Sequence, residues 1–268
     1  MQQATITGFR LSPQQRQVWR LQQEAPRLPY RVQGAIFIKG PLDLPRLQAA
    51  LSAVLQRHEI LRTTFHTLPG MDLPLQVISD SQSAWGPEED LRGQDEPTQA
   101  ARVTALWREM LEQPFDFVGG PLFRLSFLML SAAEHLLLLA LPALCADRTT
   151  LQNLVRDLSR AYAAGMAGEE LPDAPPQFAD LAEWQTTLLE ATDTQRGREY
   201  WRKQDLSALF TTKLPFEQQS PAASFTPRLL ARTLPAEVGT RIAALVQSEG
   251  IEVATFMLAC WQVVVWRL

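Results

Sequence analysis

Residues 57–65 have the sequence RHEILRTTF and join a helix to a strand. Before them, Asp43 is the expected N-cap of a helix that runs to about Arg57 and carries its apolar residues on one face. After them, Ile60–Thr67 is rich in β-branched and aromatic residues, and Leu75–Ile78 is the segment expected to pair with it. A cation at the end of a helix suits the helix dipole. Taken alone, this stretch therefore predicts a helix-to-strand junction and no activity.

Helices and strands alternate on both sides of this junction, without an internal repeat. Toward the N-terminus, Leu11–Glu24 predicts a helix with Ser12 as its N-cap, and Tyr30–Lys39 predicts a strand. Toward the C-terminus, the apolar segments Leu122–Leu130 and His135–Leu141 have the spacing of a β-hairpin. The other expected helices are Thr98–Leu111, Thr149–Ala164, Phe178–Ala191, Asp193–Leu206, Ala236–Ser248 and Val253–Leu268. Locally paired strands with interspersed helices predict an α/β or α+β fold.

Three stretches rich in Gly, Pro and polar residues are expected to be loops, and one of them divides the chain. They are Ser81–Pro97, Gly165–Pro176 and Lys213–Ala223. The last of them precedes an expected strand over Arg228–Leu234. The prolines and glycines of Gly165–Pro176 predict a linker. We therefore expect two parts, residues 1–170 and residues 171–268.

The most apolar stretch is Val253–Trp266, in the last expected helix. It is shorter than the ~20 residues that span a membrane, and it contains Gln262, so we expect a buried helix rather than a membrane span. The sequence has no later segment to cover its apolar faces. We therefore expect the second part of the fold to be truncated here, and to be completed by a longer chain or by a partner chain.

Composition excludes several classes of protein. Of the 268 residues, 46% are apolar and the net charge is -4, which is too apolar and too nearly neutral for intrinsic disorder. Lys and Arg total 25 against 29 Asp and Glu, so no nucleic-acid partner is expected. Cys145 and Cys260 form no CxxC spacing, so we expect no bound metal and a reducing, cytoplasmic location. Residues 1–10 are polar, and neither a signal peptide nor a membrane partner is expected.

Residues 57–65 resemble the second core motif of the condensation domains of nonribosomal peptide synthetases, and other segments resemble the family's other motifs in the same order. The first motif is matched by Ser12, Gln15, Trp19 and Gln23. The segment that enters the family's central strand is matched by Pro114–Asp116 and Gly120–Arg124. The fourth motif and the aromatic pair after it are matched by Phe178, Ala179, Asp180, Trp184, Gln185, Tyr200 and Trp201. The second motif is the most specific, and the resemblance covers nearly the whole chain.

The resemblance implies a chloramphenicol-acetyltransferase-like fold of two lobes, with the first lobe complete and the second truncated. It also implies that carrier proteins dock at opposite ends of a tunnel between the lobes. Each carrier delivers a substrate on its own phosphopantetheine arm, and the amine of one attacks the thioester of the other to form an amide. No cofactor bound by this chain is expected, because the carrier protein supplies the arm.

The family's active-site motif is His-His-x-x-x-Asp-Gly, at the end of a strand that enters a helix. The corresponding residues here are Pro142-Ala143-Leu144-Cys145-Ala146-Asp147-Arg148. Pro142 and Ala143 replace both histidines, and Arg148 replaces the glycine. An imidazole that titrates near neutral pH can take the proton of an amine, and such help is worth roughly 10² to 10⁴ in rate. A methyl group offers none, so no residue is assigned as the catalytic base.

Asp147 keeps its place in the motif. In the family this aspartate is structural and pairs with the arginine of the second motif, so the resemblance implies a salt bridge between Arg62 and Asp147. Its position before a helix also predicts an N-cap, and the two roles are compatible. The related heterocyclisation domains carry Asp-x-x-x-x-Asp-x-x-Ser. Asp147 and Thr150 could fit that frame, but Pro142 supplies no carboxylate.

Other reactive side chains favour structural roles. Cys145 lies in an apolar run, where a raised pKa and an inert thiol are expected. His58, His66 and His135 fall outside the motif, with His135 expected in the hairpin turn, and each is expected to be a surface or packing residue. Arg148 either fills part of the tunnel or points to solvent.

Three functional hypotheses remain open from the sequence. The first is a condensation-type domain that no longer forms amides and acts in carrier-protein docking, gating or recruitment of a neighbouring synthetase domain or a tailoring enzyme. The second is an active amide-forming enzyme, since positioning alone lowers a reaction barrier. The third is a structural half-domain that pairs with another chain.

Overall fold

The structure is a computed structural model that describes residues 8–24, 30–80, 85–168, 175–211, 213, 215 and 230–268. The chain groups into two compact units, Met1–Gly197 and Arg198–Leu268. Helix α5 (Phe178–Glu190) belongs to the first unit, although it follows the expected linker. The division between lobes after residue 170 stays a prediction. The linker's centre, residues 169–174, lies outside the described residues.

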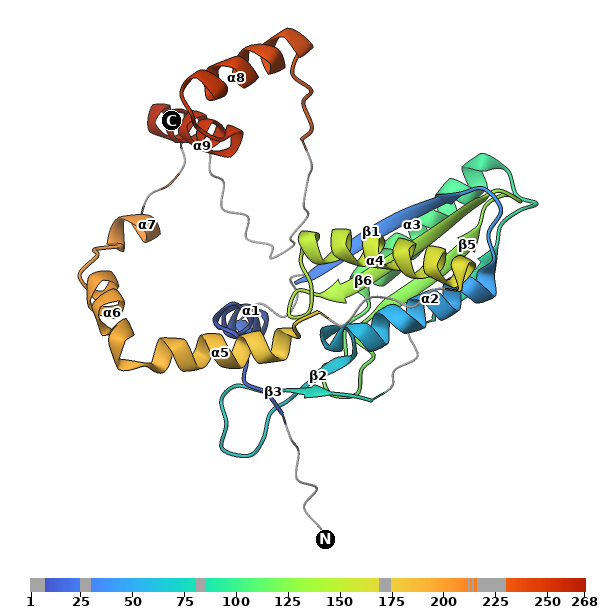
Figure 1. Ribbon diagram of the computed structural model, residues 1–268, viewed down its shortest axis with the longest axis horizontal. Helices are drawn as coiled ribbons and strands as arrows, with labels where there is room; N and C mark the ends of the chain where they lie inside the picture. Colours follow the sequence, from blue (N-terminus) through green and yellow to red (C-terminus); the bar gives the residue numbers. More distant parts are fainter. Residues whose placement is uncertain are drawn as a thin grey trace. The chain divides into compact units, whose positions relative to one another are not determined.

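Among the described residues, the first unit is built on a four-stranded sheet with the strand order β1-β6-β5-β4 (Figure 1). The strands are β1 (Arg31–Lys39), β4 (Glu88–Asp90), β5 (Arg124–Met129) and β6 (Glu134–Pro142). Strands β1, β6 and β5 pair antiparallel, and β4 pairs parallel with β5. The predicted hairpin of β5 and β6 is confirmed. The loop predicted over Ser81–Pro97 is wrong at β4, because long-range pairing with β5 overrides the low strand propensity of its acidic residues.

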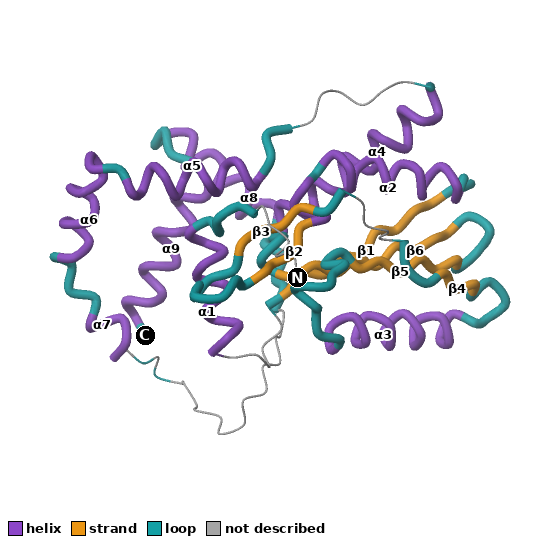
Figure 2. Tube along the Cα trace, turned by 90° about the horizontal axis from the view of Figure 1, so that it is seen from below, coloured by secondary structure: helices purple, strands orange, loops and turns teal. Residues whose placement is uncertain are grey.

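Both faces of β6 are buried, which explains why this strand is almost continuously apolar. Helices α2 (Leu44–Arg57) and α4 (Arg148–Ala167) cover one face, and α3 (Glu96–Glu112) covers the other (Figure 2). Alternate residues of β6 enter two separate clusters. Toward α2 and α4 point Leu137, Leu139 and Leu141, and toward α3 point Leu136, Leu138 and Ala140. All six are at most 1% exposed, so β6 is the centre of the core.

Leu137→Ala is expected to lower the free energy of unfolding of the first unit by about 2–5 kcal/mol, because Leu137 is 0% exposed and its loss leaves a cavity. Urea denaturation followed by circular dichroism measures the change. The matched control is Leu188→Ala on α5, whose side chain is 43% exposed and whose truncation should change stability by less than about 0.5 kcal/mol. Equal effects of the two substitutions would show that β6 is not the core strand.

The junction RHEILRTTF folds as the sequence predicts, with one added turn. Helix α2 begins after Asp43, whose carboxylate accepts a hydrogen bond from the backbone of Arg46 at 3.0 Å. After α2 the chain makes a 3₁₀ turn over Glu59–Arg62 and then enters β2 (Thr63–His66). Strand β2 pairs with β3 (Leu75–Ile78), which confirms that prediction. The turn places Ile60 outside the strand in which the sequence pattern put it.

Helix α5 is fastened to the N-terminal segment by small side chains and polar contacts. It buries Ala179, Ala182 and Thr186, which leave little gap between backbones. The guanidinium of Arg10 donates to Glu183 at 2.8 Å, and it also reaches Glu190 and Thr187. Apart from the partly buried Phe178, the larger apolar residues of α5 are at least 43% exposed; they are Leu181, Trp184, Leu188 and Leu189. Polar contacts and small side chains therefore contribute much of the packing of α5.

The second unit is helical in the part that the structure describes. Its described helices are the end of α6 (Gln195–Arg202), α7 (Ser207–Thr211), α8 (Ala236–Ser248) and α9 (Val253–Arg267). Residues 230–234 form no strand, which corrects the prediction over Arg228–Leu234 for its described part, because no neighbouring described strand offers hydrogen bonds. Most of the loop predicted over Lys213–Ala223 lies outside the described residues.

Helix α9 forms where the sequence predicted a helix, but it is not buried in this chain. Trp261 is 64% exposed and Trp266 is 82% exposed, because no described segment packs over them. The burial of α9 by a longer chain or by a partner chain stays a prediction. By length and composition, no single described helix is sufficient to cross a membrane, and α8 and α9 meet that criterion only together, across a bend of 107°.

Candidate functional site

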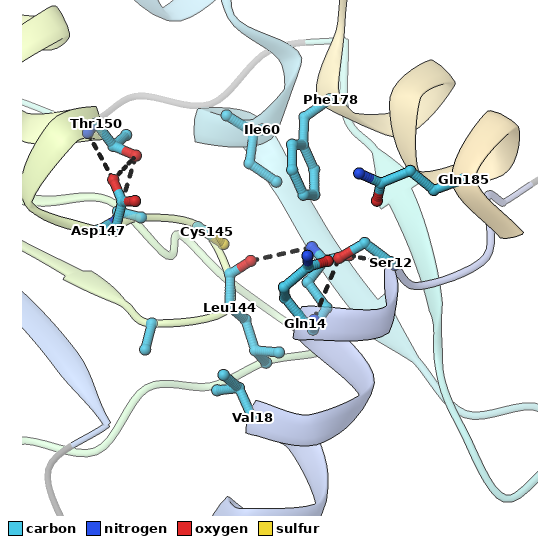
Figure 3. A pocket seen from close by; sticks show the side chains of 13 residues that line it. Ser12, Gln14, Val18, Ile60, Leu144, Cys145, Asp147, Thr150, Phe178 and Gln185 are labelled. Atoms are coloured by element: carbon cyan, nitrogen blue, oxygen red, sulfur yellow. Dashed lines mark hydrogen bonds between the residues drawn. The ribbon is translucent and has the colours of Figure 1, made fainter. Parts of the chain in front are cut away.

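A cavity of about 330 Å³ lies beside the loop that joins β6 to α4 (Figure 3). The loop lines it with Ala143, Leu144, Cys145, Ala146 and Asp147. The other lining residues are Ser12, Gln14, Gln15, Val18, Ile60, Thr150, Phe178 and Gln185. These residues come from α1 (Pro13–Glu24) and the residue before it, from the 3₁₀ turn, from α4 and from α5. The cavity thus brings together four segments that the sequence analysis singled out separately.

The backbone of this loop is held in a tight turn. Pro142 is the last residue of β6 and pairs with Arg31 of β1. Its carbonyl accepts hydrogen bonds from the backbone of Cys145 at 2.9 Å and of Ala146 at 3.2 Å. The backbone N–H of Ala143 donates to Tyr30 at 2.9 Å. The turn therefore has a defined shape, and Ala143, whose side chain carries no polar group, is among the residues that line the cavity.

The side chain of Gln15 connects the loop to two other segments. Ser12 and Gln15 form a reciprocal cap at the start of α1: the Gln15 N–H donates to Ser12 Oγ at 3.2 Å, and the Ser12 N–H donates to Gln15 Oε1 at 2.9 Å. Gln15 Nε2 then donates to the Leu144 carbonyl at 3.0 Å and to Gln76 Oε1 at 2.9 Å. Both glutamines are at most 4% exposed, so these bonds are shielded from water.

Sequence reasoning did not assign this role to Gln15, and it did not identify Gln76 at all. The signal for Gln15 was present, since Ser-x-x-Gln is a capping-box pattern whose glutamine lies at a defined place on the first turn. The signal for Gln76 is a polar residue between Leu75 and Val77, on the strand face that turns out to be buried. Its Nε2 donates to the Arg10 carbonyl at 2.9 Å, which completes the network.

Gln15→Leu is expected to lower the free energy of unfolding by about 2 kcal/mol or more, because each buried polar group left without a partner costs about 1–3 kcal/mol. Three such groups result, the Ser12 N–H, the Leu144 carbonyl and Gln76 Oε1. Hydrogen exchange should also speed up at the amides of residues 143–146. The matched control is Gln14→Leu, at the exposed neighbouring position, which should leave both stability and exchange almost unchanged. Equal behaviour of the two variants would contradict the network.

Asp147 caps α4 and does not pair with Arg62. Its carboxylate accepts hydrogen bonds from the Thr150 N–H at 2.7 Å and from the Thr150 hydroxyl at 2.8 Å. The backbone and side-chain donors of Thr150 hold the pKa of Asp147 below its usual value. The guanidinium of Arg62 instead donates to the Ser79 carbonyl and lies 3.8 Å from Glu59. The N-cap prediction is confirmed. The predicted salt bridge is absent between these two described residues, whose side chains have other partners.

Asp147→Ala is expected to lower the free energy of unfolding by about 1 kcal/mol at neutral pH, the usual cost of losing a helix N-cap. Because the pKa of Asp147 is lowered in the folded chain, the stability that its charge adds is present above the unfolded pKa of about 3.9 and is lost as the pH falls through the folded pKa. The stability gap between wild type and variant should therefore narrow in acid. Urea denaturation at several pH values measures it, with exposed Arg148→Ala as the control; a gap that does not depend on pH would contradict the assignment.

No side chain that lines the cavity is an imidazole. All three histidines lie in described residues: His58 Nε2 is 2.9 Å from Asp157, His66 contacts Thr64, and His135 stacks on Phe127. His135 is a buried residue of β6, which corrects its expected place in the hairpin turn, because the strand starts one residue before it. His58 lines a separate cavity of about 120 Å³.

The remaining reactive groups are structural. Cys145 is buried, and burial raises the pKa of its thiol, as expected. Pro142 is buried in β6, and Arg148 is exposed and lies outside the lining of the cavity. No group of three or more His, Cys, Asp or Glu among the described residues could hold a metal ion. The cavity therefore has apolar walls, amides, hydroxyls and the Asp147 carboxylate, and no imidazole among its lining residues.

Comparison with known proteins identifies the family. The family model described as "Condensation domain" matches residues 6–268. The chain belongs to the condensation-domain family. Among curated proteins it is similar to phosphinothricin tripeptide synthetase PhsC of Streptomyces viridochromogenes, with 33% identity over 96% of this chain and 24% of the relative. It is also similar to chondramide synthase cmdD of Chondromyces crocatus, with 32% identity over 96% of this chain and 7% of the relative. The chain therefore spans a small part of the length of these synthetases.

Solved structures place this condensation domain in the expected fold class. The condensation domain from monacolin K polyketide synthase MokA matches 99% of this chain and 61% of its own, with 25% identity and a TM-score of 0.77. The starter condensation domain of rhizomide synthetase RzmA matches 74% of this chain and 47% of its own, with 25% identity and a TM-score of 0.64. The mixed α/β, chloramphenicol-acetyltransferase-like condensation fold is thus confirmed.

A third neighbour is a solved complex of the X-domain and OxyB from teicoplanin biosynthesis. It matches 94% of this chain and 55% of its own, with 27% identity and a TM-score of 0.63. In the present condensation domain, the positions of the two motif histidines hold a buried proline and an alanine that lines the cavity. The fold is that of the family, whereas the chemistry at the motif differs from the family's pattern.

Proposed function

We propose that this condensation domain does not form amides and that it acts in a synthetase assembly line by docking carrier proteins, gating them or recruiting another enzyme. The observation that carries the proposal is that Ala143 lines the cavity at the position where the family's motif has a histidine. General acid–base help from such a histidine is worth roughly 10² to 10⁴ in rate. Without it, retention of the fold is better explained by binding than by catalysis.

The other groups of the cavity do not replace the missing base. Asp147 has a lowered pKa and two hydrogen bonds from Thr150, so its carboxylate is a weak proton acceptor for an amine. Cys145 has a raised pKa, so its thiol stays protonated near neutral pH. Gln14, Gln15 and Gln185 carry amides, which do not titrate. The polar groups of the cavity therefore suit binding.

The relatives support a role in a larger assembly. PhsC and cmdD are several times longer than this chain, as the covered shares of 24% and 7% indicate. The teicoplanin X-domain is solved in complex with a second protein, OxyB. A condensation-type domain whose task is recruitment would need the fold and its surfaces, but not the motif histidines. Carrier-protein docking and recruitment are both compatible with this arrangement.

The experiment supplies the chain with aminoacyl- and acyl-loaded carrier proteins from its own synthetase and measures two quantities. Binding by isothermal calorimetry is expected, and product by mass spectrometry is expected not to exceed the protein-free control. A condensation domain that keeps both motif histidines, tested with its own carriers, is the positive control for catalysis. Product above the protein-free level would contradict the proposal, and His58→Ala would then test whether His58 supplies the base.

Ala143→His is expected not to create activity, because one imidazole on a loop that also carries Pro142 does not restore the surroundings of the motif. The control for folding is an unchanged circular dichroism spectrum and unchanged carrier binding. Product formed by this variant at more than ten times the wild-type rate would show that the missing base is the sole defect. A lack of binding to every cognate carrier protein would leave recruitment as the role to test.

A further inference from the structure

We propose that a row of arginines on helix α4 is a docking surface for a protein helix that presents acidic side chains at the same spacing. The row consists of Arg148, Arg156 and Arg160, with Gln152 between the first two. It belongs to the first unit and lies outside the lining of the cavity. The proposal rests on the proposed function in one respect, namely that this domain binds other proteins. It adds the surface and the chemistry of the partner.

The row follows one exposed face of α4. Residues four apart are neighbours on a helix surface, and positions 148, 152, 156 and 160 are successive members of such a series. All four residues are exposed, and the side chains of Arg156 and Arg160 are 58% and 64% exposed. At 1.5 Å per residue the row is about 18 Å long, which matches about three turns of a partner helix.

The elements beside the row supply almost no negative charge. Helix α2 packs beside α4 on the same face of the sheet, and β1 also contacts α4 (Figure 2). Neither α2 nor β1 contains an Asp or a Glu, and the only acidic residue of α4 is Asp157. The whole chain has a net charge of -4, so this positive surface is opposite in sign to the chain that carries it.

Asp157 does not neutralise the row. Its Oδ2 lies 2.9 Å from His58 Nε2, and its Oδ1 lies 3.9 Å from one nitrogen each of Arg156 and Arg160. The Asp157 side chain is 17% exposed, and Arg156 also donates to the neutral Asn153 at 2.8 Å. One largely buried carboxylate thus lies at the limit of ion-pair distance from two exposed guanidinium groups.

The arginines lie where they do not stabilise their own helix. Arg148 is the first residue of α4, where a cation opposes the helix dipole, and it forms no ion pair with any described residue. Arg156 and Arg160 are like charges four residues apart, which destabilises a helix. The last turn of α4, where cations are favourable, contains none. Residues that break local rules without a local gain are typical of functional surfaces.

The class of partner follows from these charges and their surroundings. Guanidinium groups bind carboxylates through paired hydrogen bonds, so acidic residues four apart on a helix that lies along α4 match the row. The apolar face of α4, with Leu154, Leu158 and Ala161, is buried against the sheet and is not available to enter a lipid surface. The net charge of -4 opposes binding to a nucleic acid. An acidic protein helix is therefore the favoured occupant.

The test uses two fluorescein-labelled helical peptides of about 20 residues, long enough to be helical. Both consist of alanine, glutamine and the same number of glutamates, and both carry a hydrocarbon staple so that their helicity is equal, which circular dichroism checks. The glutamates lie four residues apart in the aligned probe and around the whole helix in the scrambled probe. The two probes therefore differ only in whether their carboxylates can meet the whole row.

Fluorescence anisotropy on the 268-residue chain at low salt is expected to give a Kd about five times lower, or more, for the aligned probe. The reason is that this probe reaches three arginines rather than one, and each exposed ion pair changes a Kd about two- to fivefold. Equal Kd values, or no binding of either probe, would overturn the proposal.

Arg156→Gln combined with Arg160→Gln is expected to raise the Kd of the aligned probe about fivefold, because two ion pairs are lost. The matched control is Arg20→Gln combined with Arg108→Gln, which removes the same charge from exposed positions of α1 and α3. This control should bind as wild type. An equal loss of affinity in both double variants would overturn the assignment to α4.

Gln152→Glu separates docking from a structural role of the arginines. The new carboxylate lies four residues from both Arg148 and Arg156, so it forms ion pairs within α4 and should keep or raise the urea midpoint. It should also raise the Kd of the aligned probe severalfold, because it neutralises the row and repels the glutamates. A variant that binds the aligned probe as wild type does would overturn the proposal.

Two competitors test the other occupants of a basic surface. A mixed-sequence DNA duplex and vesicles of phosphatidylserine and phosphatidylcholine are added at about 0.15 M salt. Neither is expected to displace the aligned probe at equal charge concentration, and displacement by either would overturn the choice of a protein partner. None of these measurements uses a carrier protein or a substrate. Failure of the proposed function, which is read from carrier binding and product formation, is therefore distinguishable from failure of this proposal.

Discussion

The hydrogen bonds of the Gln15 side chain are the interaction on which the arrangement of the site depends. Its oxygen accepts a hydrogen bond from the N–H of Ser12, just before the first helix, and its nitrogen donates to the Leu144 carbonyl and to Gln76 Oε1. It therefore ties α1, β3 and the loop after β6 together at one point. Because the group is 4% exposed, water does not compete for these bonds. The loop keeps its shape without any contribution from the motif histidines that the family has there.

The shape of the loop between β6 and α4 therefore does not depend on the motif histidines. The turn from β6 into α4 is built by backbone bonds to Pro142, by the cap at Asp147 and by Gln15. None of these contacts uses an imidazole. Replacement of both histidines by Pro142 and Ala143 therefore leaves the cavity formed and lined, but without a group that titrates near neutral pH. A domain of this kind can lose a reaction and keep a binding site.

Much of the fold could be predicted because its signals are local. The caps at Asp43 and Asp147, the periodicity of the helices and the hairpin of β5 and β6 each depend on residues close together in the sequence. The family motifs also identified which segments would meet. Two predictions failed because they depended on distant partners. Strand β4 forms through its parallel pairing with β5. Asp147 accepts hydrogen bonds from donors of its own helix, and Arg62 lies near Glu59 instead.

The sequence by itself determined that the chain is a condensation domain with its motif histidines replaced, because residue identity at a motif needs no coordinates. It also predicted a raised pKa for the Cys145 thiol from its apolar neighbours, and the burial of Cys145 confirms this. Only the tertiary structure decided that Gln15 and Gln76 share the loop with α1. The physical reason is that a hydrogen bond joins atoms at one distance and angle, and residues 15, 76 and 144 reach one another only after helices and strands have been assembled.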